Sequence, residues 1–306
     1  MITAIFNKSK PINLVLAMLL LVFGFVIVSF NSIKFIELNG FLYKIIELCI
    51  AIFSVLVVDF IVKKNAISDQ NSFVILFFSI FCFSFWSSSE NHQIMFSNLF
   101  VLLALRKIIS LKSQTNTVKK IFDAALCICI ASVFHFWAIL FFIVLYIGVA
   151  IYDSNNYKNW LTPLVSVFVA FSIASGYEMV VNNKLFYFSD ITIVRGFQTM
   201  SSSLDIAVMV FFSVLLIISL VFLSPSVKSK LQKNTMSYVI LLFALLIALI
   251  IIMLTSDKSV SMLLYTYFPL AALFAVFFEK IAKENIQSLI IYIMLIVSVT
   301  FSFLSV

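Results

Sequence analysis

The side chains of this chain that are best suited to chemistry are two histidines and a nearby carboxylate. His135 is the only Asp, Glu, Lys, Arg or His in the apolar stretch 124–152, and aromatic residues flank it on both sides. His92, the other histidine, follows Glu90 and a polar neighbour in a short serine-rich segment. Imidazole and carboxylate groups can act as general acid or base, so His92, His135 and Glu90 are the catalytic candidates.

Arginine, tryptophan and asparagine supply the candidates for ligand binding. Of the 20 lysines and arginines, only Arg106 and Arg195 are arginines. Arginine offers a rigid fork for bidentate binding of phosphate or carboxylate, so Arg195 is either a ligand of such a group or a surface-loop residue. Trp137 and Asn91, each close to a histidine, complete the ligand-binding set. Arg106 is interpreted as an orientation anchor at the end of an apolar stretch.

Several of these residues also have a purely structural interpretation. His135 is either an interfacial histidine in an aromatic belt or a donor to an anionic or sugar ligand at a turn that lines a cavity. Glu47, inside an apolar stretch, is either functional or a local ion-pair partner of Lys44. Asp59 and Lys63 are interpreted as a structural pair. No HExxH, P-loop or GxGxxG pattern occurs, so no metal site and no cofactor are expected.

Composition predicts the elements that position these residues. Hydrophobic residues make up 63% of the chain and charged residues only 11%, whereas a soluble domain carries about 25% charge. The mean hydropathy is +1.19, and apolar stretches of about 20 residues recur from end to end. The sequence therefore predicts an all-α fold, a polytopic integral membrane helical bundle that forms a single transmembrane domain over residues 1–306.

Charge and composition also limit the partners and the location. The net charge of +7 comes largely from lysines in short loops between spans, so nucleic acid is not an expected partner. The 36 phenylalanines, with many Ile, Asn, Lys and Ser, are typical of a bacterium with an AT-rich genome. The expected location is therefore the bacterial inner (cytoplasmic) membrane.

The stretch 124–152 is too long for one span. As one helix it would extend roughly 43 Å, against a hydrocarbon core of about 30 Å. Two passes that meet between Ser132 and Trp137 fit better. With this break and a cytoplasmic amino terminus, 15 of the 20 lysines and arginines lie on the cytoplasmic side, and without the break only 12 do. The positive-inside rule therefore favours the break and places His92 and His135 on the exterior face.

About 11 transmembrane helices are expected, with the amino terminus cytoplasmic and the carboxyl terminus exterior. The longest exterior connection, 179–203, contains Arg195, and long loops of this kind are more often functional than idle. The expected spans are 12–30, 41–62, 72–86, 94–109, 121–134, 136–152, 159–178, 204–223, 236–255, 260–278 and 286–304.

The stretch from 90 to 150 resembles the core of the Wzy/EpsG-type polysaccharide polymerases. Those proteins carry a polar-led helix, a basic cytoplasmic loop, and a short helix that ends in an alanine, an aromatic residue and a histidine before another span. The same order occurs here, with Ala131, Phe134, His135 and Ala138 at the matching positions. The whole chain is also similar to an uncharacterised family of bacterial inner-membrane proteins.

The resemblance implies polysaccharide biosynthesis by a metal-independent glycosyltransferase that acts on an undecaprenyl-linked saccharide at the outer face of the membrane. His92 or Glu90 would be the base for the acceptor hydroxyl, and Arg195 with His135 would bind the pyrophosphate. The alternative is a non-catalytic scaffold subunit that docks a glycosyltransferase or another cell-envelope complex. Expected partners are membrane lipid, the lipid-linked glycan and a membrane protein complex. Convergence of His92, His135 and Arg195 around one cleft would favour the enzyme.

Overall fold

The structure, a computed structural model, describes residues 2–31, 38–68, 71–84, 92–183, 203–255, 260–281 and 283–304. Helices account for nearly all of this part of the chain, and no β-strand occurs in it, which confirms the predicted all-α class. The α-helices are α1 (Ile2–Phe6), α2 (Pro11–Asn31), α3 (Leu38–Asn65), α4 (Phe73–Ser84), α5 (His92–Ile109), α6 (Thr117–Phe134), α7 (Phe141–Tyr152), α8 (Tyr157–Asn182), α9 (Ser203–Leu254), α10 (Leu264–Phe278) and α11 (Glu284–Leu304). Three short 3-10 helices are η1 (Ser110–Ser113), η2 (Phe136–Leu140) and η3 (Val260–Leu263).

Many of these helices have the length and apolarity of membrane spans. Six helical segments within the described residues are long and apolar enough to cross a membrane: Lys44–Asn65, His92–Ser113, Tyr157–Asn182, Met236–Leu254, Val260–Phe278 and Glu284–Phe301. Shorter apolar helices cover Pro11–Ile27, Phe73–Ser84, Phe136–Tyr152 and Ile206–Ser219. These six segments are what a polytopic helical membrane protein requires, while the full count of 11 spans and the orientation of the termini stay predictions.

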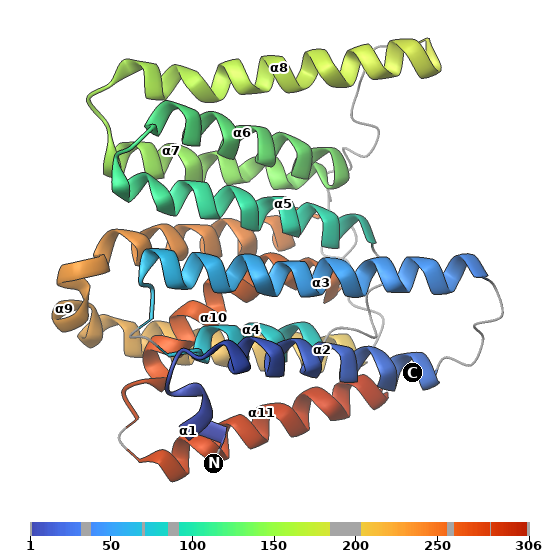
Figure 1. Cartoon of the computed structure of the whole chain (residues 1–306), viewed down its shortest axis with the longest axis vertical. Helices are drawn as coiled ribbons and strands as arrows, with labels where there is room; N and C mark the ends of the chain where they lie inside the picture. Colours follow the sequence, from blue (N-terminus) through green and yellow to red (C-terminus); the bar gives the residue numbers. More distant parts are fainter. Residues whose placement is uncertain are drawn as a thin grey trace.

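The helices run side by side, so their termini lie at two opposite ends of the bundle (Figure 1). At one of these, which we call the basic end, α5 finishes with Arg106 and Lys107 beside the first turns of α6. Lys107 forms a 2.6 Å ion pair there with Asp123 of α6. At the opposite end, the histidine end, α5 begins with His92 and α6 finishes with Phe134. The sequence assigns the basic end to the cytoplasm, and this assignment stays a prediction.

The break predicted near His135 is confirmed. α6 stops at Phe134, His135 has an extended backbone with φ −146° and ψ 109°, and η2 starts at Phe136. The backbone N–H of His135 donates to the carbonyl of Ala131 at 2.9 Å, which closes the last turn of α6. α7 then packs against both α5 and α6, so the long apolar stretch folds as two helices.

α9 doubles back on itself. A straight helix of its 52 residues would extend about 78 Å. In its first part, Phe212 stacks on Tyr267 of α10 with ring centroids 5.2 Å apart. In its second part, the Tyr238 hydroxyl donates to the carbonyl of Ile67, just beyond the carboxyl end of α3. Figure 1 shows the ribbon turning at its left-hand edge, so the two spans predicted here are two arms of one helical segment.

α4 and α10 form the centre of the bundle. Every residue of α4 is buried, and so are nearly all residues of α10. Phe77 of α4 meets Phe274 and Phe278 of α10 edge-on, with ring centroids 4.8 and 5.0 Å apart. Edge-to-face contacts of this kind are favourable beyond the area that the rings bury. The packing fixes α10, which carries Tyr265 toward the histidine end.

Polar pairs link the surrounding elements to this centre. The Ser84 hydroxyl at the end of α4 donates to that of Ser298 in α11 at 2.7 Å. The Asn71 amide, just before α4, donates to the carboxylate of Glu279 after α10 at 2.6 Å. Hydrogen bonds between membrane helices contribute about 0.6–2 kcal/mol each, so these pairs fix register more than they supply stability.

α8 lies at the edge of the bundle, where it packs mainly on α6 (Figure 1). The Ser166 hydroxyl donates across this contact to the carbonyl of Phe122, at 3.3 Å. The rest of the helix is largely exposed, with Phe168 at 71% and Val180 at 85%. An apolar helix with this much exposed surface suits a lipid environment, in which lipid tails are as apolar as the side chains.

Candidate functional site

A close ion-pair contact joins Glu47 and His92 at the histidine end. Oε1 of Glu47 in α3 lies 2.5 Å from Nδ1 of His92, the first residue of α5. Glu47 is only 2% exposed, whereas the His92 side chain is 39% exposed. A buried carboxylate in a membrane helix is costly unless it is paired. The structure therefore pairs Glu47 with His92 of another helix, 45 positions later in the chain.

The contact lies at the start of α5. His92 is the first residue of this helix, so the imidazole that meets Glu47 is positioned by the first turn of α5. With Nδ1 turned to Glu47, Nε2 lies on the other side of the ring. An imidazole oriented by a carboxylate in this way is suited to act as a general base.

His135 lies against a buried tyrosine of the central helix. Its ring centroid is 6.0 Å from that of Tyr265 in α10, with an interplanar angle of 33°. Tyr265 is 1% exposed, whereas His135 is half-buried. The ring of His135 thus contacts the central helix α10, and both interpretations of this histidine stay predictions.

A hydroxyl chain connects the surroundings of His135 to α5. The Tyr265 hydroxyl donates to Ser97 Oγ at 2.7 Å, and Ser97 Oγ donates to the carbonyl of Ala131 at 2.9 Å. Ser97 follows His92 by five residues, a rise of about 7.5 Å along α5. The hydroxyl chain thus links α10 and α5 to the last turn of α6, next to His135.

Trp137 lies in the turn after His135 and is half-buried against the core. Its indole meets the ring of Phe136 edge-on, with centroids 5.5 Å apart. An indole in this position offers an aromatic face close to His135. The role of Trp137 in ligand binding stays a prediction.

Three of the predicted site residues cannot be placed. Glu90, Asn91 and Arg195 lie outside the described residues. Of the four residues expected to share a cleft (Glu47, Glu90, His92 and His135), the structure shows a contact between Glu47 and His92, and the cleft itself stays a prediction. Convergence of His92, His135 and Arg195 also stays a prediction.

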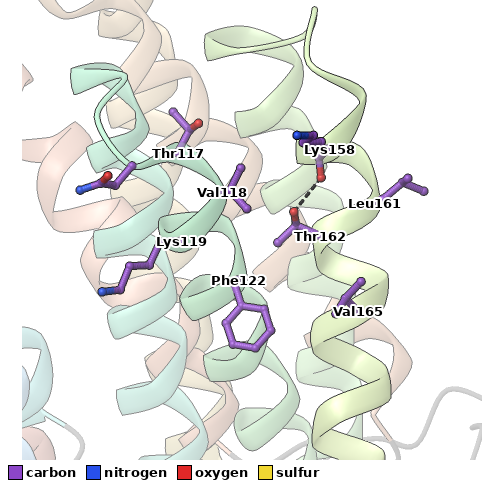
Figure 2. Close-up of a pocket in the computed structure, with 9 residues that line it drawn as sticks. Thr117, Val118, Lys119, Phe122, Lys158, Leu161, Thr162 and Val165 are labelled. Atoms are coloured by element: carbon purple, nitrogen blue, oxygen red, sulfur yellow. Dashed lines mark hydrogen bonds between the residues drawn. The ribbon is translucent and has the colours of Figure 1, made fainter.

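A larger groove lies at the basic end, between the first turns of α6 and α8. Its volume is about 780 Å³, and Figure 2 shows Val118 and Phe122 of α6 facing Thr162 of α8 across it. The Thr162 hydroxyl donates to the carbonyl of Lys158 at 2.6 Å, which anchors the first turns of α8. Lys119 and Lys158 line this groove, and no Asp, Glu or His of the described residues does, so it lacks the imidazole–carboxylate pair of the candidate active site.

Sequence reasoning did not identify Ser97 or Tyr265. Both are buried polar residues in otherwise apolar helices, and a polar group within the bilayer usually has a partner or a function. That signal was present in the sequence, but serine and tyrosine are common in membrane helices, and only the hydrogen bond between these two residues distinguishes them from other buried hydroxyls. Glu47 was weighed from sequence, whereas its partner became identifiable only when α3 and α5 were placed side by side.

Comparisons of this chain with protein-family models, with curated proteins and with solved structures found no match.

Proposed function

We propose that this protein is a membrane transferase that moves a glycosyl group from an undecaprenyl-linked saccharide to an acceptor hydroxyl at the exterior face of the inner membrane. The observation that carries the proposal is the buried Glu47 carboxylate held 2.5 Å from Nδ1 of His92. A general base of this kind is what an acceptor hydroxyl requires in order to attack an anomeric carbon. The resemblance of the stretch 90–150 to polysaccharide polymerases supports the choice of a glycan substrate.

The proposed step assigns each residue a role. Nε2 of His92 takes the proton of the acceptor hydroxyl while its oxygen bonds to the anomeric carbon of the donor. The bond from that carbon to the phosphate oxygen of the lipid pyrophosphate breaks at the same time, and the electron pair leaves with the pyrophosphate. Glu47 stabilises the imidazolium that forms, as the carboxylate does in a catalytic triad. Arg195 and protonated His135 are proposed to bind the departing pyrophosphate.

Complementation of a deletion strain tests this proposal. His92→Gln and Glu47→Gln should each lower the rate of glycan extension about a hundredfold or more, because loss of a general base costs that much. The readout is the chain length of surface glycan on gels, with the amount of each variant in the membrane measured in parallel. Phe168→Leu on the exposed face of α8 is the control and should leave chain length unchanged. Full-length glycan in the His92→Gln strain contradicts the proposal.

Arg195 is tested by a change that keeps its charge. Arg195→Lys removes the planar fork while the positive charge remains, so it should shorten the glycan if the residue holds pyrophosphate. Arg106→Lys, at the basic end, should leave the glycan unchanged. His135→Ala should also shorten the glycan. Equal behaviour of the two arginine variants would remove Arg195 from the proposed site.

A non-catalytic scaffold subunit for a cell-envelope complex is the second candidate. The observation that favours it is the isolated position of α8, which contacts little besides α6 and has open space around Gly176. Small residues on an exposed membrane helix permit close approach of another helix. Unchanged glycan in the deletion strain, together with loss of an associated membrane complex in native gels, would establish this candidate instead.

A further inference from the structure

A small cavity of about 90 Å³ lies at the basic end, between α3, α5 and α6. Four of the residues that line it are cationic: Lys64, Arg106, Lys107 and Lys120. A cavity of this volume has room for several waters, and hence for one tetrahedral oxyanion. The positive-inside rule accounts for cations on this face of the membrane, but it does not require them to surround a single cavity.

The ring of Phe60 holds two of these cations. The guanidinium carbon of Arg106 lies 3.9 Å from the ring centroid, and Nζ of Lys64 lies 5.2 Å from the same point. Cation–π contacts of this geometry fix the plane of an arginine without using its N–H donors. Neither cation forms an ion pair within the described part of the chain. Phe60 therefore holds both cations in place, and no carboxylate of the described residues pairs with either of them.

The other two cations are already committed to protein partners. Lys107 is paired with Asp123 at 2.6 Å, and Lys120 donates to the carbonyl of Ser110 at 2.8 Å and to Ser113 Oγ at 2.6 Å. Lys120 lies just before the predicted span 121–134, and hence outside the membrane-spanning residues. Burial, with the charges of Lys64 and Lys107 adding to it, lowers the pKa of Lys120 below its ordinary value. Like charges are thus crowded around the cavity, and Asp123 offsets one of the four.

We propose that this cavity is a binding site for an oxyanion of the phosphate class, contacted by Arg106 and Lys64 and held in the positive potential of Lys107 and Lys120. Arginine presents the N–H fork that matches a phosphate group, while lysine adds a point charge. The anion is either a free phosphate group or the headgroup of an anionic lipid. The site lies at the opposite end of the bundle from His92, and it does not depend on the proposed transferase function.

The first experiment uses inorganic phosphate with the full-length protein in phosphatidylcholine nanodiscs. The shift of the unfolding temperature is followed as phosphate is added, at constant ionic strength kept with chloride, and gives an apparent Kd. Arg106→Gln and Lys64→Gln should each raise this Kd about tenfold, the effect expected for one charge-assisted contact. Arg106→Lys should raise it less. Lys283→Gln, which removes one charge from an exposed residue away from the cavity, should leave it unchanged.

The second experiment distinguishes the two sources of the anion. The same variants are placed in nanodiscs of mixed phosphatidylglycerol and phosphatidylcholine, and native mass spectrometry counts the phosphatidylglycerol molecules that stay bound. Phosphate binding that depends on Arg106 in pure phosphatidylcholine assigns a free phosphate group. Retention of phosphatidylglycerol that depends on Arg106, without phosphate binding, assigns a lipid headgroup.

The site is overturned if neither phosphate binding nor phosphatidylglycerol retention depends on Arg106. It is also overturned if Lys283→Gln weakens binding as much as Arg106→Gln does. Circular dichroism of each variant checks that it is folded. If Arg106→Gln fails this check, the decision rests on Lys64→Gln, because Lys64 is exposed in the last turn of α3 and its loss removes no buried contact.

Discussion

Two side chains from different helices change each other's chemistry at the histidine end. Glu47 by itself would be an expensive buried charge in the middle of an apolar helix, and His92 by itself a half-exposed imidazole. At 2.5 Å the two groups are in direct contact, so Glu47 is not buried without a partner. The pair is thus both a structural contact between α3 and α5 and the group best suited to move a proton.

The stability of the pair can be tested separately from its catalytic role. His92→Ala should destabilise the protein by about 1–3 kcal/mol, because Glu47 is then buried without its partner. The double variant Glu47→Gln, His92→Ala should recover part of this loss, since an uncharged amide costs less to bury than a carboxylate. Thermal unfolding in detergent at neutral pH measures both. A double variant that is less stable than His92→Ala would show that the contact contributes nothing.

At the scale of elements, the hydroxyl of Tyr265 fastens the central helix to the start of α5. Ser97→Ala leaves this buried hydroxyl without its acceptor, at a cost of about 1–3 kcal/mol. Tyr265→Phe removes the donor as well, so the double variant should be less destabilised than the sum of the two single variants. The measurement is again thermal unfolding. Additive losses would mean that the 2.7 Å contact carries no coupling.

Two glycines in neighbouring helices provide a matched test of helix packing. A Cβ at Gly148 of α7 would lie 2.6 Å from Cγ2 of Ile108 in α5, whereas a Cβ at Gly176 of α8 would meet nothing within 4 Å. Gly148→Ala should therefore destabilise the bundle by about 1–3 kcal/mol through overpacking. Gly176→Ala should be neutral or slightly stabilising. Equal unfolding temperatures for the two variants would contradict the close packing of α7 on α5.

The elements that sequence predicted best are those in which length or charge carried the signal. Membrane thickness made the stretch 124–152 too long for one span, and the lysine distribution indicated the same break, which the structure has at His135. Packing inside the bundle could not be predicted in this way. Central α4 and peripheral α8 are both apolar, since core and lipid select the same residue types, so no periodicity distinguished them.

The candidate site shows the same limit. His92 and His135 stood out because imidazoles are rare in apolar sequence, and Glu47 because a buried carboxylate is costly. The contacts could not be assigned from sequence, because each joins helices that are distant in the chain. Glu47 meets His92 where α3 packs beside α5, and Ser97 meets Tyr265 where α5 packs beside α10. Arg106 was interpreted as an anchor from its position alone. Its contact with Phe60 became evident only when α3 lay beside α5.

At the scale of the whole molecule, the bundle has two chemically different ends. The histidine end carries the pair of Glu47 with His92 and the contact of His135 with Tyr265, whereas the basic end carries the cationic cavity around Arg106 and the large groove between α6 and α8. A membrane around the helices would separate these two regions completely. Any transfer between them would require a ligand that itself crosses the bilayer, so we expect the two ends to act on different compartments.

This arrangement leads to a prediction about orientation. The distribution of lysines and arginines assigns the basic end to the cytoplasm. In a variant without native cysteines, a cysteine at Asn155 or Ser229, beside Lys158 and Lys230, should react with a membrane-impermeant maleimide only after the cells are permeabilised. A cysteine at Asn182, at the end of α8, should react in intact cells.

The two sets of positions control for each other, because a reversed protein would exchange their labelling. Labelling of Ser229→Cys in intact cells would show that the basic end faces the exterior and would contradict the predicted orientation. It would also move His92 and His135 to the cytoplasmic face, away from the compartment in which the proposed acceptor is extended. Orientation therefore decides more than topology, since the acid–base pair can serve the proposed transfer only if its end of the bundle faces outward.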